Sequence, residues 1–122
     1  MITAPKAREF AVAWIAAWNS RDLEGVLSHY TDDFQLSSPL IATIAGEPTG
    51  VLSGKESVRR YWSAALAARP DLRFRLVGVY AGVASVVIHY QRHDGSLSAE
   101  HFEFLPSGKV CRSSAHPVTM DI

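Results

Sequence analysis

The hydrophobic pattern of the first part of the chain predicts helices. Apolar residues recur at the i, i+3, i+4, i+7, i+8 spacing of one helical face, at Phe10, Ala13, Trp14, Ala17 and Trp18. Thr3 is a suitable N-cap for this helix. A second, short helix is expected to turn Leu23, Val26, Leu27 and Tyr30 inward. Asp32 and Asp33 are expected to form the turn that follows.

A third helix follows a long connection. Residues 39–53 contain glycines and prolines among Leu, Ile and Val residues. A loop of this length inside a domain is often functional, so we expect it to act as a lid over an apolar ligand. Ser53 and Glu56 have the spacing of a capping box, which predicts the start of the helix. Its buried stripe is expected to be Val58, Tyr61, Trp62, Ala65 and Leu66.

The rest of the chain predicts strands. Apolar and polar residues alternate over 34–38, 86–90 and 100–104, as in strands with one buried face, and residues 110–117 form a last strand. Over 72–80 the alternation places Leu72, Phe74, Leu76 and Tyr80 on one face. Asp94–Gly95 is a hairpin signal. This order indicates the α+β class. We expect a single domain over residues 1–122, with a cone-shaped, curved antiparallel sheet wrapped around three N-terminal helices and enclosing one apolar pocket.

Charge and cysteine content limit the partners and the compartment that we expect for this protein. Twelve basic residues balance 12 acidic ones, and no block of like charge occurs, so we expect no nucleic-acid and no membrane partner. Cys111 is the only cysteine, so no internal disulfide forms, which fits a reducing compartment. The N-terminal residues lack the apolar core of a signal peptide, and no apolar run could span a bilayer. We therefore expect a cytoplasmic protein.

Several segments together resemble one superfamily. They are residues 14–22, residues 30–33 before a strand that ends at Pro39, residues 53–56 leading into Tyr61–Trp62, and residues 100–104 followed by 108–110. Their order and spacing are similar to the nuclear transport factor 2-like superfamily, in its SnoaL-like and ketosteroid isomerase-like branch. The resemblance implies the cone fold and a homodimer formed through the sheet, on the face that carries Val87, His89 and Arg112. Members include isomerases, dehydratases, epoxide hydrolases, cyclases and non-catalytic binding domains.

The comparison with ketosteroid isomerases favours a similar pocket but not the same reaction. That enzyme type uses an Asp base and an oxyanion hole made of a Tyr and a protonated Asp. By the resemblance, Ser38 stands where the base would be, Trp14 matches the Tyr, and Glu100 keeps a carboxyl at the third position. Serine cannot act as the base unaided. The resemblance therefore implies the pocket, and we do not expect a true ketosteroid isomerase.

Glu100 is the strongest catalytic candidate. It shares a strand face with Phe102 and Phe104, and burial among aromatic residues raises the pKa of a carboxyl towards a value suited to acid–base work. The alternative is a solvated carboxyl at the wet end of the strand.

The strand register decides where the histidines lie. Pairing Ile88 with Glu100 or Phe102 keeps the bulky apolar residues on one face and leaves His89 and His101 on the other. A slip of one residue would bring His89 opposite Glu100 but would turn Ile88 and Tyr90 outward, so we favour the first pairing. His116 faces outward unless a bulge reverses it. No close-spaced ligand motif occurs, and we predict no metal site.

These observations lead to one expectation and one alternative. We expect a cofactor-free enzyme of isomerase, cyclase, dehydratase or hydrolase type that acts on a modest apolar molecule, with Glu100 as the catalytic residue. The substrate-binding residues would be Trp14, Trp18, Tyr30, Phe34, Ser38, Trp62, Tyr90 and Phe102. The alternative is a non-catalytic module of the same fold that binds a ligand or forms a dimer. The sequence leaves open which of the two is present.

Overall fold

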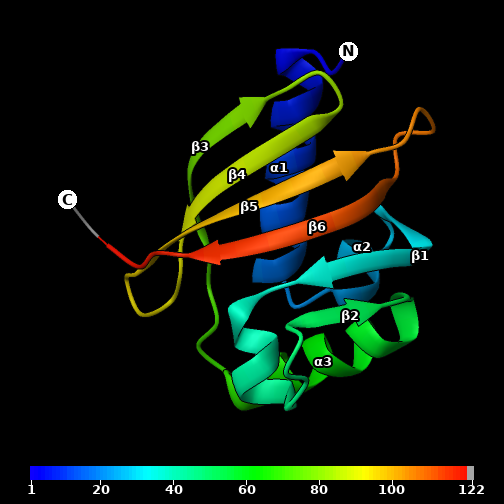
Figure 1. Cartoon of the computed structure of the whole chain (residues 1–122). Coiled ribbons are helices and arrows are strands. Elements are labelled where there is room, and N and C mark those ends of the chain that lie inside the picture. The colour runs from blue at the N-terminus through cyan, green and yellow to red at the C-terminus, as the bar shows by residue number, and fades with distance from the viewer. Residues whose placement is uncertain (121–122) are drawn as a thin grey trace.

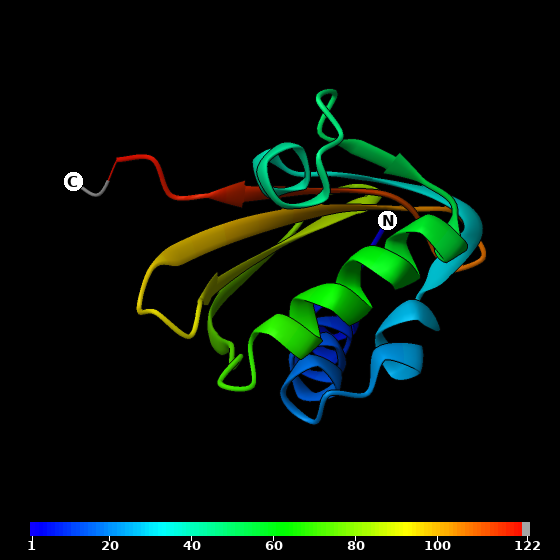
Figure 2. The same cartoon turned by 90° about the horizontal axis from the view of Figure 1, so that it is seen from below.

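Three helices pack on one face of a six-stranded sheet. The computed structural model describes residues 1–120. Its helices are α1 (Ala4–Asn19), α2 (Leu23–Leu27) and α3 (Lys55–Ala68), with a one-turn π-helix, η1 (Ile41–Ala45). The strands are β1 (Tyr30–Ser37), β2 (Val51–Ser53), β3 (Arg75–Ala81), β4 (Ser85–Gln91), β5 (Leu97–Phe104) and β6 (Val110–Pro117). Figure 1 shows this arrangement, and Figure 2 shows α1 and α3 beneath the curved sheet.

The sheet confirms the predicted α+β class and curvature. Its strand order is β2-β1-β6-β5-β4-β3. Neighbouring strands are antiparallel except β1 and β6, which run parallel and are separated along the chain by β2, α3 and β3–β5. The first and last strands of the meander, β3 and β6, therefore lie on opposite sides of β4 and β5.

Helix α1 begins where the sequence predicts. The Thr3 hydroxyl accepts a hydrogen bond from the Lys6 amide at 3.3 Å. The buried face is centred on Ala7, Ala11, Trp14, Ile15 and Trp18, whereas Ala13 is exposed. The predicted stripe was therefore wrong at Ala13. Small alanines occur on every side of this helix and fit more than one stripe, so the two large indoles decide which face is buried.

Two local signals were misleading. Asp32 and Asp33 lie within β1 as exposed residues rather than in a turn, because Tyr30 already pairs with Val110 of β6. The predicted capping box at Ser53 does not form. Gly54 occupies the N-cap position of α3 at a φ of 88°, a left-handed conformation that suits glycine.

The connection of residues 39–53 is more ordered than a simple loop. It contains η1 and strand β2, and β2 pairs with β1. Ile41 is buried in the core, whereas Ile44 is exposed. On α3, Val58, Trp62 and Leu66 form the buried stripe, and Tyr61 and Ala65 lie half-buried beside it.

The meander has the favoured register. Ile88 pairs with Glu100, and His89 pairs with Ala99, so His89 and Glu100 point to opposite faces of the sheet. In β3 a register shift between Leu76 and Gly78 reverses the alternation. Tyr80, which the pattern assigned to the inner face, is consequently exposed, and Val79 packs against the core instead.

His101 and His116 lie on the outer face of the sheet, as His89 does. His101 pairs with Ser114, and exposed His116 has its Nε2 2.9 Å from the Ser114 hydroxyl. Val87, His89 and Arg112 lie on this same outer face. A dimer through this face stays a prediction. Across the described residues, no helix is both long and apolar enough to cross a membrane.

Candidate functional site

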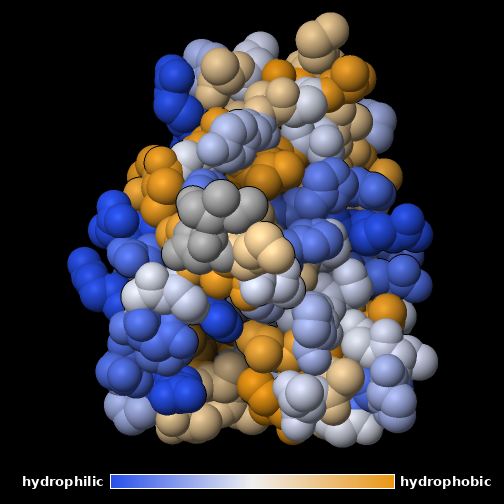
Figure 3. All heavy atoms as spheres, turned by 60° about the vertical axis from the view of Figure 1, so that its left-hand side comes forward, coloured by the Kyte–Doolittle hydropathy of each residue, from blue (hydrophilic) through white to orange (hydrophobic). Residues whose placement is uncertain are grey.

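A cavity lies between the concave face of the sheet and α3. Its volume is about 240 Å³. Aromatic and aliphatic side chains form most of its wall: Trp14, Trp18, Leu36, Tyr61, Trp62 and Phe74. The polar side chains in the wall are Ser38, Arg69, Tyr90, Arg92, His93, Asp94, Ser98 and Glu100. Figure 3 shows hydrophilic and hydrophobic side chains meeting around a recess on this side of the molecule.

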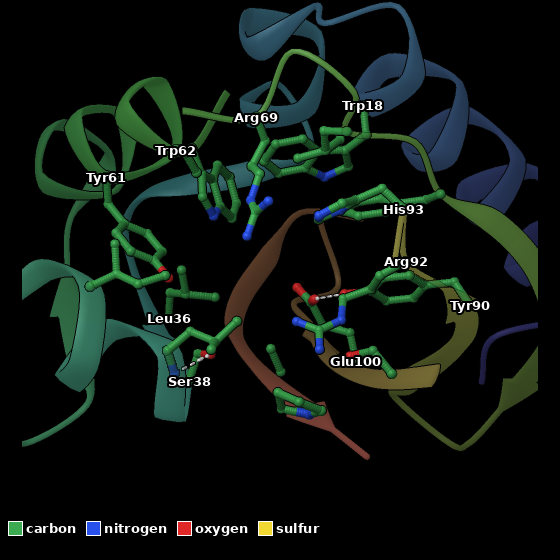
Figure 4. Close-up of a pocket in the computed structure, with 18 of the residues that line it drawn as sticks. Trp18, Leu36, Ser38, Tyr61, Trp62, Arg69, Tyr90, Arg92, His93 and Glu100 are labelled. Atoms are coloured by element: carbon green, nitrogen blue, oxygen red, sulfur yellow. Dashed lines mark hydrogen bonds between the residues drawn. The ribbon is translucent and has the colours of Figure 1, made fainter. Parts of the chain in front are cut away.

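The alternation of β5 turns Glu100 into this cavity. Ser98, Glu100 and Phe102 are buried in alternate positions of the strand, and Glu100 is only 4% exposed. The Tyr90 hydroxyl on β4 donates to Glu100 Oε1 at 3.2 Å. The Ser113 hydroxyl on β6 donates to Glu100 Oε2 at 3.0 Å. The carboxyl is thus held from both neighbouring strands, as Figure 4 shows for Tyr90.

Burial dominates the electrostatics of this carboxyl. It raises the pKa of Glu100 from an ordinary 4.5 to about 7, and the hydrogen bonds from Ser113 and Tyr90 oppose the rise. Burial and the charge of Glu100 in turn raise the pKa of Tyr90 well above its usual range, so the phenol stays a donor. At neutral pH both forms of the Glu100 carboxyl are populated.

Both the ionised and the protonated form of the Glu100 carboxyl can keep their hydrogen bonds in this position. The carboxylate accepts from two hydroxyl groups, one on each oxygen. When the carboxyl gains a proton it becomes a donor, and a hydroxyl can rotate to accept from it. The site can therefore hold or release a proton without moving its backbone.

Trp14 and Tyr30 form a buried pair rather than two separate ligand contacts. The Trp14 indole Nε1 donates to the Tyr30 hydroxyl at 3.0 Å. Trp14 lines the cavity, whereas Tyr30 is 1% exposed and lies in the core behind it. Burial and the charge of Glu100 raise the pKa of Tyr30 well above its usual range.

Ser38 is buried directly after the end of β1 and lines the cavity. Its hydroxyl accepts from the Leu40 amide at 3.2 Å, and its own amide donates to the Gly50 carbonyl at 2.9 Å. These bonds fix the residue between β1 and η1. The hydroxyl hydrogen is left to donate to a ligand.

The structure brings most of the predicted site residues to the cavity. Trp14, Trp18, Ser38, Trp62, Tyr90 and Glu100 line it. Phe34 and Phe102 are fully buried in the core instead, with Phe34 against Tyr30 at a ring distance of 4.3 Å and Phe102 against Trp14 at 5.3 Å. Indole and phenol rings fill the space between these two side chains and the cavity, so Phe34 and Phe102 support the cavity wall from behind.

Sequence reasoning missed the polar rim. Asp94 was predicted only as part of a hairpin turn, and no role was predicted for Arg69, Arg92 or His93, yet all four line the cavity. Three adjacent ionisable residues at a hairpin were a signal, but their position above the cavity depends on how the sheet curls. The pairing of β5 with β6 brings the Ser113 hydroxyl to Glu100, a contact between two strands that the pattern along the chain does not contain.

No cluster of three His, Cys, Asp or Glu side chains suited to a metal ion occurs within residues 1–120.

A curved sheet closed by three helices is the architecture of the nuclear transport factor 2-like class. A family model described as the SnoaL-like domain matches residues 11–115, and the chain belongs to that family. It is similar to the crystal structure of a SnoaL-like protein of unknown function from Burkholderia thailandensis. The identity is 49% and the TM-score 0.93, over 96% of this chain and 98% of that one.

More distant structures share the fold. One is TerC co-crystallised with polyporic acid, at 18% identity and a TM-score of 0.76, covering 93% of this chain and 92% of that one. Another is the epoxide hydrolase/cyclase-like enzyme SalBIII, which has a role in pyran ring formation in polyether salinomycin. It has 15% identity and a TM-score of 0.74, covering 98% of this chain and 95% of that one. No curated protein matches the chain.

Proposed function

We propose that this protein is a cofactor-free acid–base enzyme for a small, largely apolar molecule that carries a carbonyl or hydroxyl group. Glu100 is its catalytic residue, and the reaction is an isomerisation, cyclisation, dehydration or hydrolysis. The observation that carries this proposal is a buried carboxyl, in the wall of a largely apolar cavity, with a pKa raised to about 7. Acid–base catalysis is most efficient when the pKa of the group lies near the working pH.

The proton would move through Glu100 alone. In its carboxylate form Glu100 takes a proton from a carbon or hydroxyl of the substrate, and in its acid form it returns the proton at another position. Tyr90 and Ser113 hold the carboxyl in both states. Ser38, which lines the same cavity directly after β1, donates its hydroxyl hydrogen to a substrate oxygen. The cyclase-like enzyme of the same fold supports chemistry of this kind at the level of the superfamily.

The test uses one- and two-ring β,γ-unsaturated ketones and epoxides, with conversion followed by NMR in deuterated buffer. Glu100→Gln keeps the shape of the side chain but cannot exchange a proton, so turnover of any converted compound should fall by about 10²- to 10⁴-fold. Glu103→Gln makes the same change on the outer face of the same strand and should leave turnover unchanged. A Glu100→Gln variant with wild-type turnover would refute the assignment.

One observation favours a second candidate, a non-catalytic binding module. Ser38 occupies the strand end where ketosteroid isomerase-like enzymes carry a carboxylate, and its hydroxyl is already engaged by the Leu40 amide. Compounds from the same panel that bind in the cavity and are recovered without deuterium incorporation or conversion would support this candidate over the enzyme.

A further inference from the structure

Two buried nitrogen atoms in the cavity wall lack partners. Trp18 is 4% exposed, and none of residues 1–120 offers its Nε1 a hydrogen bond. The same holds for Nδ1 of His93. Both residues line the cavity. The neighbouring indole of Trp14, by contrast, reaches the Tyr30 hydroxyl. Because a buried donor without a partner has lost its hydrogen bonds to water, a ligand acceptor gains more at the Trp18 N–H than at a solvated donor.

The rim beside these nitrogens carries two arginines and one aspartate. Arg69 and Arg92 line the cavity, and Figure 4 shows the Arg69 side chain reaching into it from the end of α3. Within the described part of the chain, no side chain pairs with the Arg69 guanidinium. The only carboxylate at the rim, Asp94, is exposed, and its Oδ1 accepts from the Ser96 amide at 3.0 Å and the Ser96 hydroxyl at 2.6 Å. These bonds hold the pKa of Asp94 at about 2.

We propose that the ligand carries an anionic oxygen group, a carboxylate in the simplest case, bound by Trp18, Arg69 and His93 at the rim of the cavity. This inference rests on the proposed function, in which the opposite end of the ligand carries the reacting carbon and lies at Glu100. In Figure 4, Trp18, Arg69 and His93 lie across the cavity from Glu100. The separation keeps the anionic group of the ligand away from the carboxylate form of Glu100.

Cavity size limits the ligand to a small organic acid. A cavity of about 150 Å³ in another protein holds benzene. The volume here is about 240 Å³ and opens at a cationic rim. A one- or two-ring carboxylic acid therefore fits, with its rings among the tryptophans and its carboxylate at Arg69. The guanidinium fork suits a carboxylate because it can donate two parallel hydrogen bonds.

The test compares naphthalene-2-carboxylate with naphthalene-2-carboxamide, which have the same rings and differ in charge. NMR titration at about pH 6 keeps the probe ionised, since a carboxylic acid titrates near pH 4. We expect the carboxylate to bind at least about tenfold more tightly than the amide, as charge-assisted hydrogen bonds require. The indole N–H signal of Trp18, assigned with Trp18→Phe, should move on binding of the carboxylate.

Arg69→Gln should remove the preference for the carboxylate and leave the affinity of the carboxamide unchanged, which also shows that the cavity is intact. Arg60→Gln is the matched control, because it removes the same charge from an exposed position of α3 that does not line the cavity. Glu100→Gln should retain the preference.

The outcomes separate this inference from the function on which it rests. Equal binding of the two probes, a preference that survives Arg69→Gln, or an unmoved Trp18 signal would each overturn the anionic anchor alone. Failure of both probes to bind would overturn the small-molecule site together with the anchor.

Discussion

Replacing Glu100 by Gln should make the stability of the protein less dependent on pH. The side chain is buried, and its carboxyl has a pKa of about 7 in the folded state against 4.5 in an exposed chain. Between these two values the folded state keeps a proton that the unfolded state has lost. The free energy of unfolding therefore falls as pH rises through this window.

The magnitude follows from the size of the pKa difference. Each pKa unit corresponds to about 1.4 kcal/mol, so the shift of Glu100 removes about 3 kcal/mol between pH 4.5 and pH 8. Gln does not titrate, and it can still take part in hydrogen bonds with Tyr90 and Ser113. Relative to the wild type, the variant should gain about 3 kcal/mol over this range, on top of any constant offset from its altered hydrogen bonds.

Urea unfolding at a series of pH values measures this difference. The buried tryptophans report unfolding by fluorescence. Groups that titrate equally in both proteins cancel when the two curves are subtracted. Glu103→Gln is the control, because it makes the same chemical change on the outer face of β5.

A difference between variant and wild type that stays flat from pH 4.5 to pH 8 would refute the reasoning. It would mean that water or a structural rearrangement solvates the carboxyl in the folded state. The case for acid–base catalysis by Glu100 would then lose its physical basis. A change of m-value with pH would instead show that the unfolded or native state itself changes, and the comparison would be repeated with direct NMR titration of Glu100.

Three further predictions concern groups around the site. Ser113→Ala removes a hydrogen bond that lowers the pKa of Glu100, so NMR titration should place that pKa higher than in the wild type. Tyr30→Phe leaves the buried N–H of Trp14 without its acceptor and should cost about 1–3 kcal/mol in urea unfolding. Gly50 has a φ of 71°, so Gly50→Ala should destabilise the fold by at least about 1 kcal/mol, measured in the same way.

Matched variants control two of these changes. Tyr80 is 57% exposed, and Tyr80→Phe should alter stability by less than about 0.5 kcal/mol. Gly46 has the same φ of 71° as Gly50, but a Cβ there meets nothing within 4 Å, whereas at Gly50 it would lie 3.2 Å from the Ser38 carbonyl oxygen. Gly46→Ala should therefore be the milder change, and an equal loss at both glycines would show that backbone strain alone accounts for the effect.

The sequence by itself determined the class of fold and the direction of Glu100. The alternation around Ile88 and Glu100 has a period of two, and a slip of one residue would have exposed bulky apolar residues. Pairing Ile88 with Glu100 or with Phe102 turns Glu100 inward in either case, and the structure has the pairing with Glu100. The predicted start of α1 at Thr3 also held, because capping depends on a few neighbouring residues. In the first case the signal is an alternation of residue types that repeats along the chain, and in the second it is a contact between near neighbours in the sequence.

Only the tertiary structure decided which inward-facing residues reach open space. Phe34 and Phe102 point inward as the pattern requires, yet larger rings lie between them and the cavity. Likewise, the curl of the sheet places Arg92 and His93 at the cavity rim, and the pairing of β5 with β6 brings Ser113 to Glu100. A period along the chain fixes the face of a strand but carries no information about curvature or depth, because these arise from packing between segments distant in sequence.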